Sequence, residues 1–170
     1  MKKLENKVAI VTGGARDLGR AVSLKMAEAG AKVVINYFDN EQDAIDTQAL
    51  IAQMGGESII VQGDMTKAAD VKHIVEEAVK AFGNEIHVLV NVVGGIVGRK
   101  KITEQDEDWY NFLMDVNMKS CWLCTREVVP FMPKGASIIN FSSLAARDGG
   151  GPGASMYATA KGAVAVFTRS

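Results

Sequence analysis

The chain has 170 residues, of which 48% are hydrophobic and 23% charged, and its formal net charge at pH 7 is −1. This balance supplies apolar material for one sizeable core and gives no reason to expect nucleic-acid binding. No apolar run approaches the roughly 20 residues that cross a bilayer, and no leader-like segment precedes the first apolar run, so we expect a cytoplasmic protein without membrane contact.

Short apolar runs alternate with segments of helical spacing. Strands are predicted at residues 8–11, 33–35, 59–61, 88–90 and 137–141. Helices are predicted near residues 19–29, 41–54, 68–82 and 104–132, and from 155 onward. This alternation indicates a single α/β domain over residues 1–170, a doubly wound parallel sheet in a Rossmann-like three-layer α/β/α arrangement. A ligand is expected at the carboxyl ends of the strands.

The first predicted strand leads directly into the segment TGGARDLGRAV, residues 12–22. A glycine-containing turn followed by a helix leaves backbone N–H groups free at the helix N-terminus, where the helix dipole favours an anion. The segment therefore predicts a cradle for the pyrophosphate of a nucleotide.

A second feature combines Tyr157 and Lys161, four residues apart, with Ser143 at the end of the run SIINFSS. On a helix this spacing places both side chains on one face, about one turn apart. A phenol is a poor acid or base at neutral pH, but a nearby ammonium stabilises its ionised form. Alone, the short pattern more often marks a half-exposed helix position; the nucleotide cradle upstream favours acid–base chemistry.

Together these features resemble the short-chain dehydrogenase/reductase family over the whole chain. The glycine motif of the family, T-G-x-x-x-G-x-G, is matched at Thr12, Gly13 and Gly19, whereas Asp17 replaces the middle glycine. Aspartate tolerates a left-handed backbone better than most residues, but it adds a carboxylate near the expected phosphates. A neighbouring Arg16 or a side chain turned away would offset the repulsion.

Two further segments match the family in part or in full. Asn91 and Gly94 resemble the ends of the family's N-N-A-G, with Val92 and Val93 in place of the middle residues. The added β-branched groups are expected to change the packing beside the cofactor. Asp64, in VQGDMT, resembles the aspartate that contacts the adenine in the family.

The resemblance implies a catalytic set of Asn117, Ser143, Tyr157 and Lys161. Tyr157 would donate a proton to the carbonyl oxygen, which Ser143 would hold by a hydrogen bond. Lys161 would bind the nicotinamide ribose and stabilise the phenolate, and Asn117 would position a water that links Lys161 to solvent. Ser142, one place away, is the alternative to Ser143, although strand alternation would point its side chain to the opposite face. The spacing from Ser143 to Tyr157 is one residue longer than the family pattern. We expect the extra residue in the glycine-rich stretch RDGGGPG, a loop at the substrate mouth.

The cofactor choice depends on charge near the adenine ribose. The position that is acidic in NAD-using members corresponds to Tyr37, preceded by Asn36, while Arg16 resembles the basic residue that pairs with a 2′-phosphate. NADP(H) is therefore favoured over NAD(H), with Asp39 as the residue that would reverse the choice if the strand ended two residues later. The cofactor-binding residues implied by the resemblance are Gly13, Arg16, Asp17, Leu18, Gly19, Asn36, Tyr37, Asp64, Met65, Asn91, Gly94, Tyr157 and Lys161.

Within the family the chain looks most like the 3-oxoacyl-[acyl-carrier-protein] reductases, so the expected substrate is a small-molecule or carrier-bound carbonyl. Other alcohol, sugar or steroid dehydrogenases, and a non-catalytic dinucleotide- or partner-binding protein, remain alternatives. Family members are longer and commonly form dimers or tetramers, and the segment AKGAVAVFTRS ends inside a predicted helix. We therefore expect a homo-oligomer and a missing C-terminal part.

The remaining candidate sites favour structural roles. Cys121 and Cys124 fall within one predicted helix, so a redox or metal function is disfavoured. His73 and His87 lack partners at ligand spacing, and no metal site is predicted. The basic run at residues 99–101 is interpreted as a solvated loop in preference to a docking point for an acidic carrier.

Overall fold

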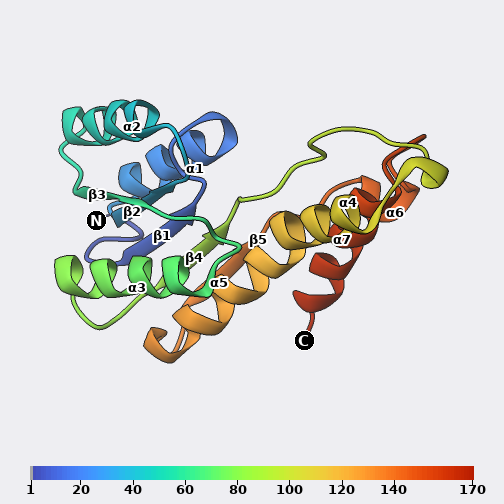
Figure 1. Ribbon diagram of the computed structural model, residues 1–170. Coiled ribbons are helices and arrows are strands. Elements are labelled where there is room, and N and C mark those ends of the chain that lie inside the picture. The colour runs from blue at the N-terminus through green and yellow to red at the C-terminus, as the bar shows by residue number, and fades with distance from the viewer. Residues whose placement is uncertain (1) are drawn as a thin grey trace.

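The computed structural model describes residues 2–170, which form a five-stranded parallel sheet with helices on both faces (Figure 1). The strands are β1 (Val8–Thr12), β2 (Lys32–Tyr37), β3 (Ser58–Gln62), β4 (Val88–Asn91) and β5 (Ser137–Asn140). Their order across the sheet is β3-β2-β1-β4-β5, and all four neighbouring pairs are parallel. The order reverses at β1, and this is the switch point at which doubly wound sheets bind ligands. The predicted fold class is confirmed.

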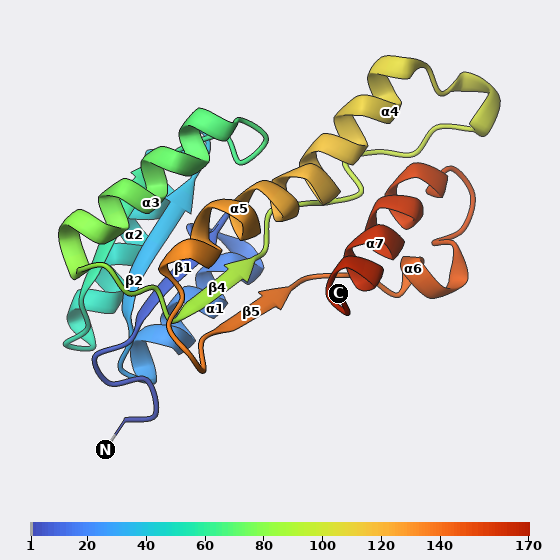
Figure 2. The same ribbon diagram turned by 90° about the horizontal axis from the view of Figure 1, so that it is seen from below.

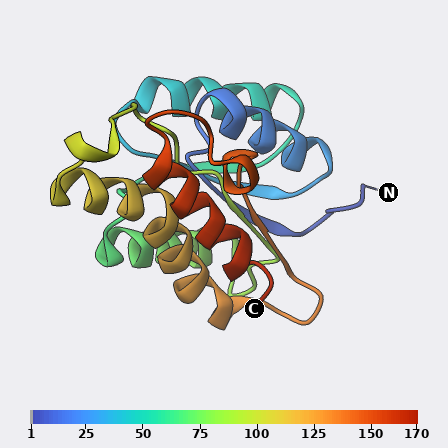
Figure 3. The same ribbon diagram turned by 90° about the vertical axis from the view of Figure 1, so that its right-hand side faces the viewer.

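The helices divide into two layers and a projecting group. The α-helices are α1 (Asp17–Glu28), α2 (Glu41–Gln53), α3 (Ala68–Phe82), α4 (Glu107–Met114), α5 (Ser120–Val128), α6 (Ala145–Asp148) and α7 (Ser155–Phe167). Helices α1 and α2 cover one face of the sheet, and α3 and α5 cover the other (Figure 1). Helices α4, α6 and α7 lie beyond the carboxyl ends of the strands (Figure 2), and α7 runs beside α4 (Figure 3).

The single helix predicted over residues 104–132 is wrong in its interior and at its ends. The π-helical turn η2 (Asp115–Lys119) lies in its interior between α4 and α5, and the 3-10 turns η1 (Ile102–Glu104) and η3 (Val129–Phe131) lie at its ends. The Ser120 N–H bonds to the Asp115 carbonyl five residues earlier, which is the π pattern. A π turn adds one residue to a helix and often marks a functional position.

The core has two halves, one on each face of the sheet. Along β1, Ile10 points to the α3 and α5 side, while Ala9 and Val11 point to the α1 and α2 side. This alternation is the two-residue period of a strand, and a parallel sheet covered on both faces needs apolar side chains on both. Each fully buried Val, Leu or Ile contributes about 1.5–3 kcal/mol, so the central strands hold the two layers together.

The strand register brings the carboxyl ends of three strands level. Thr12 of β1 pairs with Asn91 of β4, and Asn91 pairs with Asn140 of β5. The loops that follow these strands therefore start from one row at the edge of the sheet. Within residues 2–170, no helix combines the length and apolar character that a membrane crossing requires.

His87, immediately before β4, links the stability of the sheet to pH. Its Nδ1 accepts a hydrogen bond from the Val8 N–H at 3.2 Å, and the side chain is 12% exposed. Burial, with a further contribution from the charge of Lys7, lowers the pKa of His87 below its usual 6.5. A protonated imidazole has no free lone pair, so it could not accept the Val8 bond.

We predict that the free energy of unfolding falls as the pH drops below about 6.5, because the unfolded chain then binds a proton that the folded chain excludes. His87→Asn retains an acceptor but does not titrate, so its stability should decline less between pH 7 and pH 5. Urea unfolding at several pH values measures this, with the same substitution at exposed His73 as the control. Parallel pH profiles for wild type and His87→Asn would contradict the prediction.

Candidate active site

The glycine turn after β1 is compact and is held by Asn36. Gly13 has a φ of 60°, and its N–H donates to the Asn36 Oδ1 at 2.9 Å. The Gly14 N–H donates to the Asn36 carbonyl at the same distance. A Cβ on Gly19 would lie 1.9 Å from the Gly13 carbonyl oxygen, so the start of α1 packs directly on the turn. Glycine is required at this position because no side-chain atom fits.

Asp17 adopts the backbone conformation that the family motif assigns to glycine. Its φ is 49°, and its side chain is 89% exposed, with a carboxylate oxygen 3.9 Å from the Arg16 Nε. Solvent exposure and the neighbouring guanidinium reduce the effect of this charge, although Asp17 still lines the hollow at the start of α1. Helix α1 begins without a side-chain cap, so the N–H groups of its first turn remain available to an anion.

A groove follows the carboxyl ends of β1, β2 and β3 and is made of two adjoining hollows that share Gly13, Asn36, Phe38 and Val93. Ten of the thirteen predicted cofactor residues line it: Gly13, Arg16, Asp17, Leu18, Gly19, Asn36, Tyr37, Asp64, Met65 and Gly94. The groove is also lined by residues that were not predicted from the sequence: Ala15, Phe38, Asn40, Asp43, Gly63, Thr66, Lys67, Phe112, Asp115 and Val116. The sequence signal for Phe38 was that a large apolar residue directly follows a strand. In the structure, the exposed fraction of Phe38 is 63%.

The second strand ends at Tyr37, as the cofactor argument assumed, and presents no carboxylate there. Asn36 is buried, and its Nδ2 donates to the Gly63 carbonyl at 3.0 Å, so its amide ties the glycine turn to the loop after β3. The Tyr37 hydroxyl donates to Glu41 at 3.2 Å, and burial together with that carboxylate raises the pKa of Tyr37. Asp39 lines the groove together with Arg16, so this end carries both a cation and an acid.

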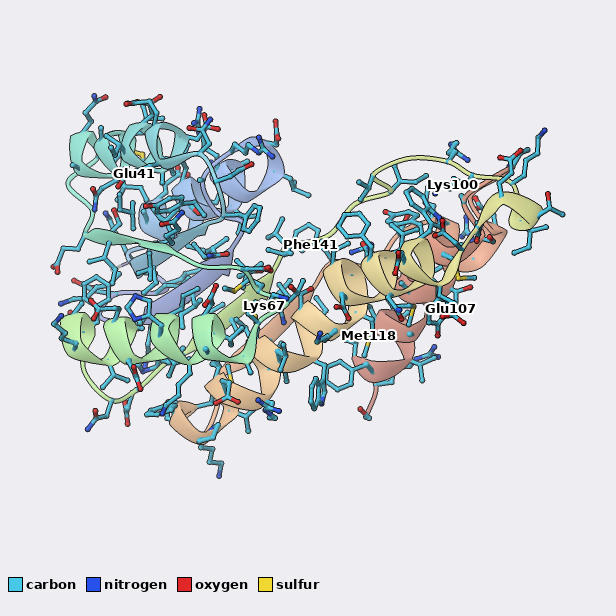
Figure 4. The ribbon with its side chains drawn as sticks, in the orientation of Figure 1. Glu41, Lys67, Lys100, Glu107, Met118 and Phe141 are labelled. Carbon is cyan, nitrogen blue, oxygen red and sulfur yellow. The ribbon has the colours of Figure 1, made fainter. Side chains whose placement is uncertain are left out.

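Asp64 is fixed by the turn that leads into α3. One of its carboxylate oxygens accepts from the Thr66 N–H at 2.9 Å and from the Thr66 hydroxyl at 2.7 Å. Its own N–H donates to Asp70 at 2.8 Å. The second carboxylate oxygen remains available to a ligand. Lys67 follows at the carboxyl end of the sheet, where the strands meet the projecting helices (Figure 4).

Asn117 and Lys161 converge on Gly94, at the end of the groove. A Cβ on Gly94 would lie 2.7 Å from the Asn117 Oδ1 and 2.8 Å from the Lys161 Nζ. The Asn117 amide accepts from the Gly95 N–H at 2.9 Å and donates to the Gly95 carbonyl at 3.0 Å. It also donates to the Leu113 carbonyl at 3.1 Å. The π turn therefore holds Asn117 where it fixes the loop after β4.

Lys161 is the one buried lysine among the residues that the structure describes, with an exposed fraction of 4%. Its Nζ donates to the Phe141 carbonyl at 2.8 Å, which leaves two N–H donors for other partners. Burial lowers the pKa of Lys161. Phe141 directly follows β5 and lies between the sheet and the projecting helices (Figure 4).

The two serines after β5 have different partners. The Ser142 hydroxyl donates to the Lys161 carbonyl at 2.8 Å, so its proton is used to hold α7. The Ser143 oxygen accepts from the Ala145 N–H at 3.1 Å and keeps its own proton. A hydroxyl with a free proton can donate to a substrate oxygen, and Ser143 is therefore the better candidate. Tyr157 lies in the first turn of α7, one turn before Lys161.

Three predicted cofactor residues do not line the groove. Tyr157 and Lys161 are not among its lining residues, and Asn91 is buried inside the sheet. The Asn91 Nδ2 donates to the Asn140 Oδ1 at 2.8 Å, across β4 and β5. The Asn91 Oδ1 is buried and has no hydrogen-bond partner among the described residues. The structure thus gives Asn91 a role in joining strands, and no contact with the groove.

Cys121 and Cys124 are both buried in α5. Burial raises the pKa of Cys121 to about 11 and that of Cys124 to about 12. A thiol with such a pKa is protonated at neutral pH and is a weak nucleophile. Cys121 donates to the Asn140 Oδ1 at 3.3 Å, so it packs beside the Asn91 and Asn140 pair.

Comparison with known proteins agrees with this geometry. Residues 7–170 match the family described as short chain dehydrogenase, and the chain belongs to that family. An uncharacterized oxidoreductase of Methylorubrum extorquens is 37% identical over 164 residues, covering 96% of this chain and 65% of the relative. A hydroxynaphthalene reductase-like protein of Metarhizium robertsii is 32% identical over 171 residues, covering 99% of this chain and 62% of the relative.

Solved structures show the same fold. A short chain dehydrogenase from Burkholderia cenocepacia in complex with NADP has a TM-score of 0.93 at 28% identity, covering 98% of this chain and 67% of that one. An NADH-dependent reductase responsible for alginate metabolism has a TM-score of 0.93 at 29% identity, covering 99% and 71%. The chain thus spans roughly two thirds of the length of these relatives.

We predict that Gly19→Ala destabilises the fold by about 1–3 kcal/mol, because the new methyl group meets the Gly13 carbonyl and the backbone has to move. Gly162→Ala is the matched control, since a Cβ at this position in α7 meets nothing within 4 Å. It should leave stability unchanged or raise it by up to about 1 kcal/mol. Chemical unfolding measures both, and equal stability of the two variants would show that the turn can relax.

Proposed function

We propose that the chain forms the cofactor-binding and catalytic part of an NADP(H)-dependent oxidoreductase that reduces a carbonyl group to an alcohol. The observation that carries this proposal is the convergence of Asn117 and Lys161 on Gly94, at the end of a groove that begins at the uncapped N-terminus of α1. A buried cation beside a phosphate cradle suits a ligand that carries both phosphates and a ribose.

The residues present fit a dinucleotide. The first turn of α1 offers N–H groups to the phosphates, and Asp64 and Met65 line the hollow in which an adenine would lie. The nicotinamide, when bound, supplies the hydride. The two free donors of Lys161 would bind the ribose hydroxyls, and its charge would stabilise the phenolate of Tyr157. The protein contributes position and electrostatic stabilisation.

The remaining catalytic roles are proposed for Tyr157, Ser143 and Asn117 from the family pattern. Tyr157 would donate its proton to the carbonyl oxygen, and Ser143 would donate a hydrogen bond to that oxygen. The Asn117 Oδ1 accepts from the Gly95 N–H and keeps a second lone pair, which can hold the water that returns a proton through Lys161. These roles account for a buried lysine and a π turn at one place.

NADP(H) is the proposed cofactor because Arg16 lines the groove and Tyr37 stands where an acidic residue would repel a 2′-phosphate. Asp39 in the same groove opposes this choice. The nearby Asp43 opposes it less, since it pairs with Arg20 at 3.4 Å. A solved relative is described in complex with NADP and another as NADH-dependent, so the family accommodates both.

For the substrate we propose a 3-oxoacyl thioester, with other small carbonyl compounds as the alternative class. An acidic carrier would approach the basic run after β4, but Arg99 bonds to backbone carbonyls, Lys100 packs on Trp109, and Lys101 pairs with Glu104 at 3.6 Å. A cytoplasmic setting is consistent with two free, buried thiols. A homo-oligomer is supported by exposed aromatic side chains on α4 and α5, those of Tyr110, Phe112 and Trp122.

The proposal predicts that NADPH binds more tightly than NADH and that the bound NADPH is oxidised when an acetoacetyl thioester is added. Fluorescence titration followed by absorbance measures both steps. Arg16→Ala should remove most of the preference for NADPH, because the 2′-phosphate loses its cation. NADH binding should change little in this variant.

Asp17 supports the non-catalytic alternative, since its carboxylate lies at the phosphate end of the groove. Failure of wild type to bind either cofactor, with binding restored in Asp17→Asn, would favour that alternative. Failure of both proteins would reject dinucleotide binding altogether.

The proposed roles also predict that Tyr157→Phe abolishes turnover and leaves NADPH affinity nearly unchanged, whereas Lys161→Ala impairs both. Only the lysine is expected to contact the ribose. Single-turnover oxidation of NADPH and its dissociation constant are measured for each variant, after thermal unfolding has shown that both are folded. Equal loss of affinity in the two variants would contradict the assignment.

A further inference from the structure

Arg99 joins two loops that are distant in sequence. One of its terminal nitrogens donates to the Gly150 carbonyl at 2.9 Å and to the Pro152 carbonyl at 2.8 Å. The Lys100 N–H donates to the Gly153 carbonyl at 3.3 Å. The Gln105 amide donates to the Lys100 carbonyl at 2.8 Å and to the Ser155 hydroxyl at 3.0 Å. The loop after β4 is therefore bonded along its length to the loop before α7.

The second loop has little conformational preference of its own. Gly149, Gly150, Gly151 and Gly153 all have φ between 69° and 82°. Glycine reaches such values without strain but loses more entropy on ordering than any other residue. A Cβ on Gly153 would lie 3.0 Å from the Arg99 Cβ, so the two backbones also touch. Arg99 is thus the side chain that selects one arrangement of a permissive segment.

The first loop contains a strained turn next to Arg99. Val97 has a φ of 54°, which is unfavourable for a β-branched residue. The Gly98 N–H donates to the Ile96 carbonyl at 2.5 Å, closing a three-residue turn around Val97. Such turns are rare and persist only where the surroundings hold them, most often at functional sites. The bonds of Arg99 and Lys100 directly after the turn supply that restraint.

Both loops are connected directly to the proposed catalytic residues. The first continues from Gly95, which bonds to Asn117. The second lies between α6 and α7, within the segment that connects Ser143 to Tyr157. We infer that Arg99 is a positioning residue for the substrate site: it holds the glycine-rich loop against the strained turn and so fixes the distance between the serine and the tyrosine. This inference rests on the proposed function.

The other two residues of the basic run differ from Arg99. The Lys100 Nζ lies 4.6 Å from the centroid of the Trp109 ring and 3.9 Å from Asp106, so it packs on α4. The side chain of Lys101 is 81% exposed. If the basic run affected substrate binding only through its positive charge, Lys101 would contribute as Arg99 does. If Arg99 acts by holding the loop, the effect requires its planar guanidinium.

The test compares Arg99→Ala, Arg99→Lys and Lys101→Ala with wild type by two readouts. Hydrogen exchange of the backbone amides of residues 149–151, 153 and 154 should become about tenfold faster in both Arg99 variants and stay unchanged in Lys101→Ala. In turnover with an acetoacetyl thioester, KM should rise about tenfold in Arg99→Ala, with the NADPH dissociation constant unchanged. Added guanidinium ion should partly restore the KM of the Ala variant.

Unchanged exchange in Arg99→Ala would overturn the inference. So would a KM that rises equally in Arg99→Ala and Lys101→Ala and stays normal in Arg99→Lys, because this pattern would show attraction of a charged substrate. If wild type reduces no carbonyl compound, the proposed function fails, and the exchange experiment still decides whether Arg99 restrains the loop.

Discussion

A row of buried polar side chains at the carboxyl ends of the strands is the constraint on which the site depends. The Thr12 hydroxyl accepts from the N–H groups of residues 92 and 93, at 3.0 and 3.3 Å, and so anchors the loop after β4. Asn36 holds the glycine turn and the loop after β3. Asn91 and Asn140 bond to each other between β4 and β5. Because these strands end level, this row of side chains positions the glycine turn and the loops after β3 and β4.

The sequence was sufficient to predict this framework because short apolar runs that alternate with amphipathic helical segments are strong local signals. The five strands and four of the helices fall close to their predicted positions. The π turn was not predictable, since it adds a single residue within a helical pattern and is held by contacts of Asn117 with Gly95, 22 residues away. The role of Asn36 was equally hidden, because its partners come from three segments.

The residues that depart from the family motifs are accommodated by their immediate surroundings. Asp17 adopts the left-handed backbone of the missing glycine and keeps its carboxylate in solvent. Val92 packs against the core under α1 and α2, and Val93 packs against the core under α3 and α5. Successive residues of an extended chain point to opposite faces, so each added side chain finds apolar neighbours. The sequence identified these positions. How each side chain is accommodated depends on its burial and on the direction in which it points, and only the folded chain specifies both.

The two sides of the proposed site are held by different kinds of interaction. The cofactor side is fixed by backbone bonds and close approaches, such as that of Gly19 to Gly13, where few substitutions fit. The proposed substrate side includes a glycine-rich loop that accepts two hydrogen bonds from Arg99. A bond to a charged group contributes about 1.5–3 kcal/mol, comparable to the entropy of ordering one or two residues. Under the proposed function, small changes in this loop would therefore alter substrate binding while the groove, held by the polar row, keeps its shape.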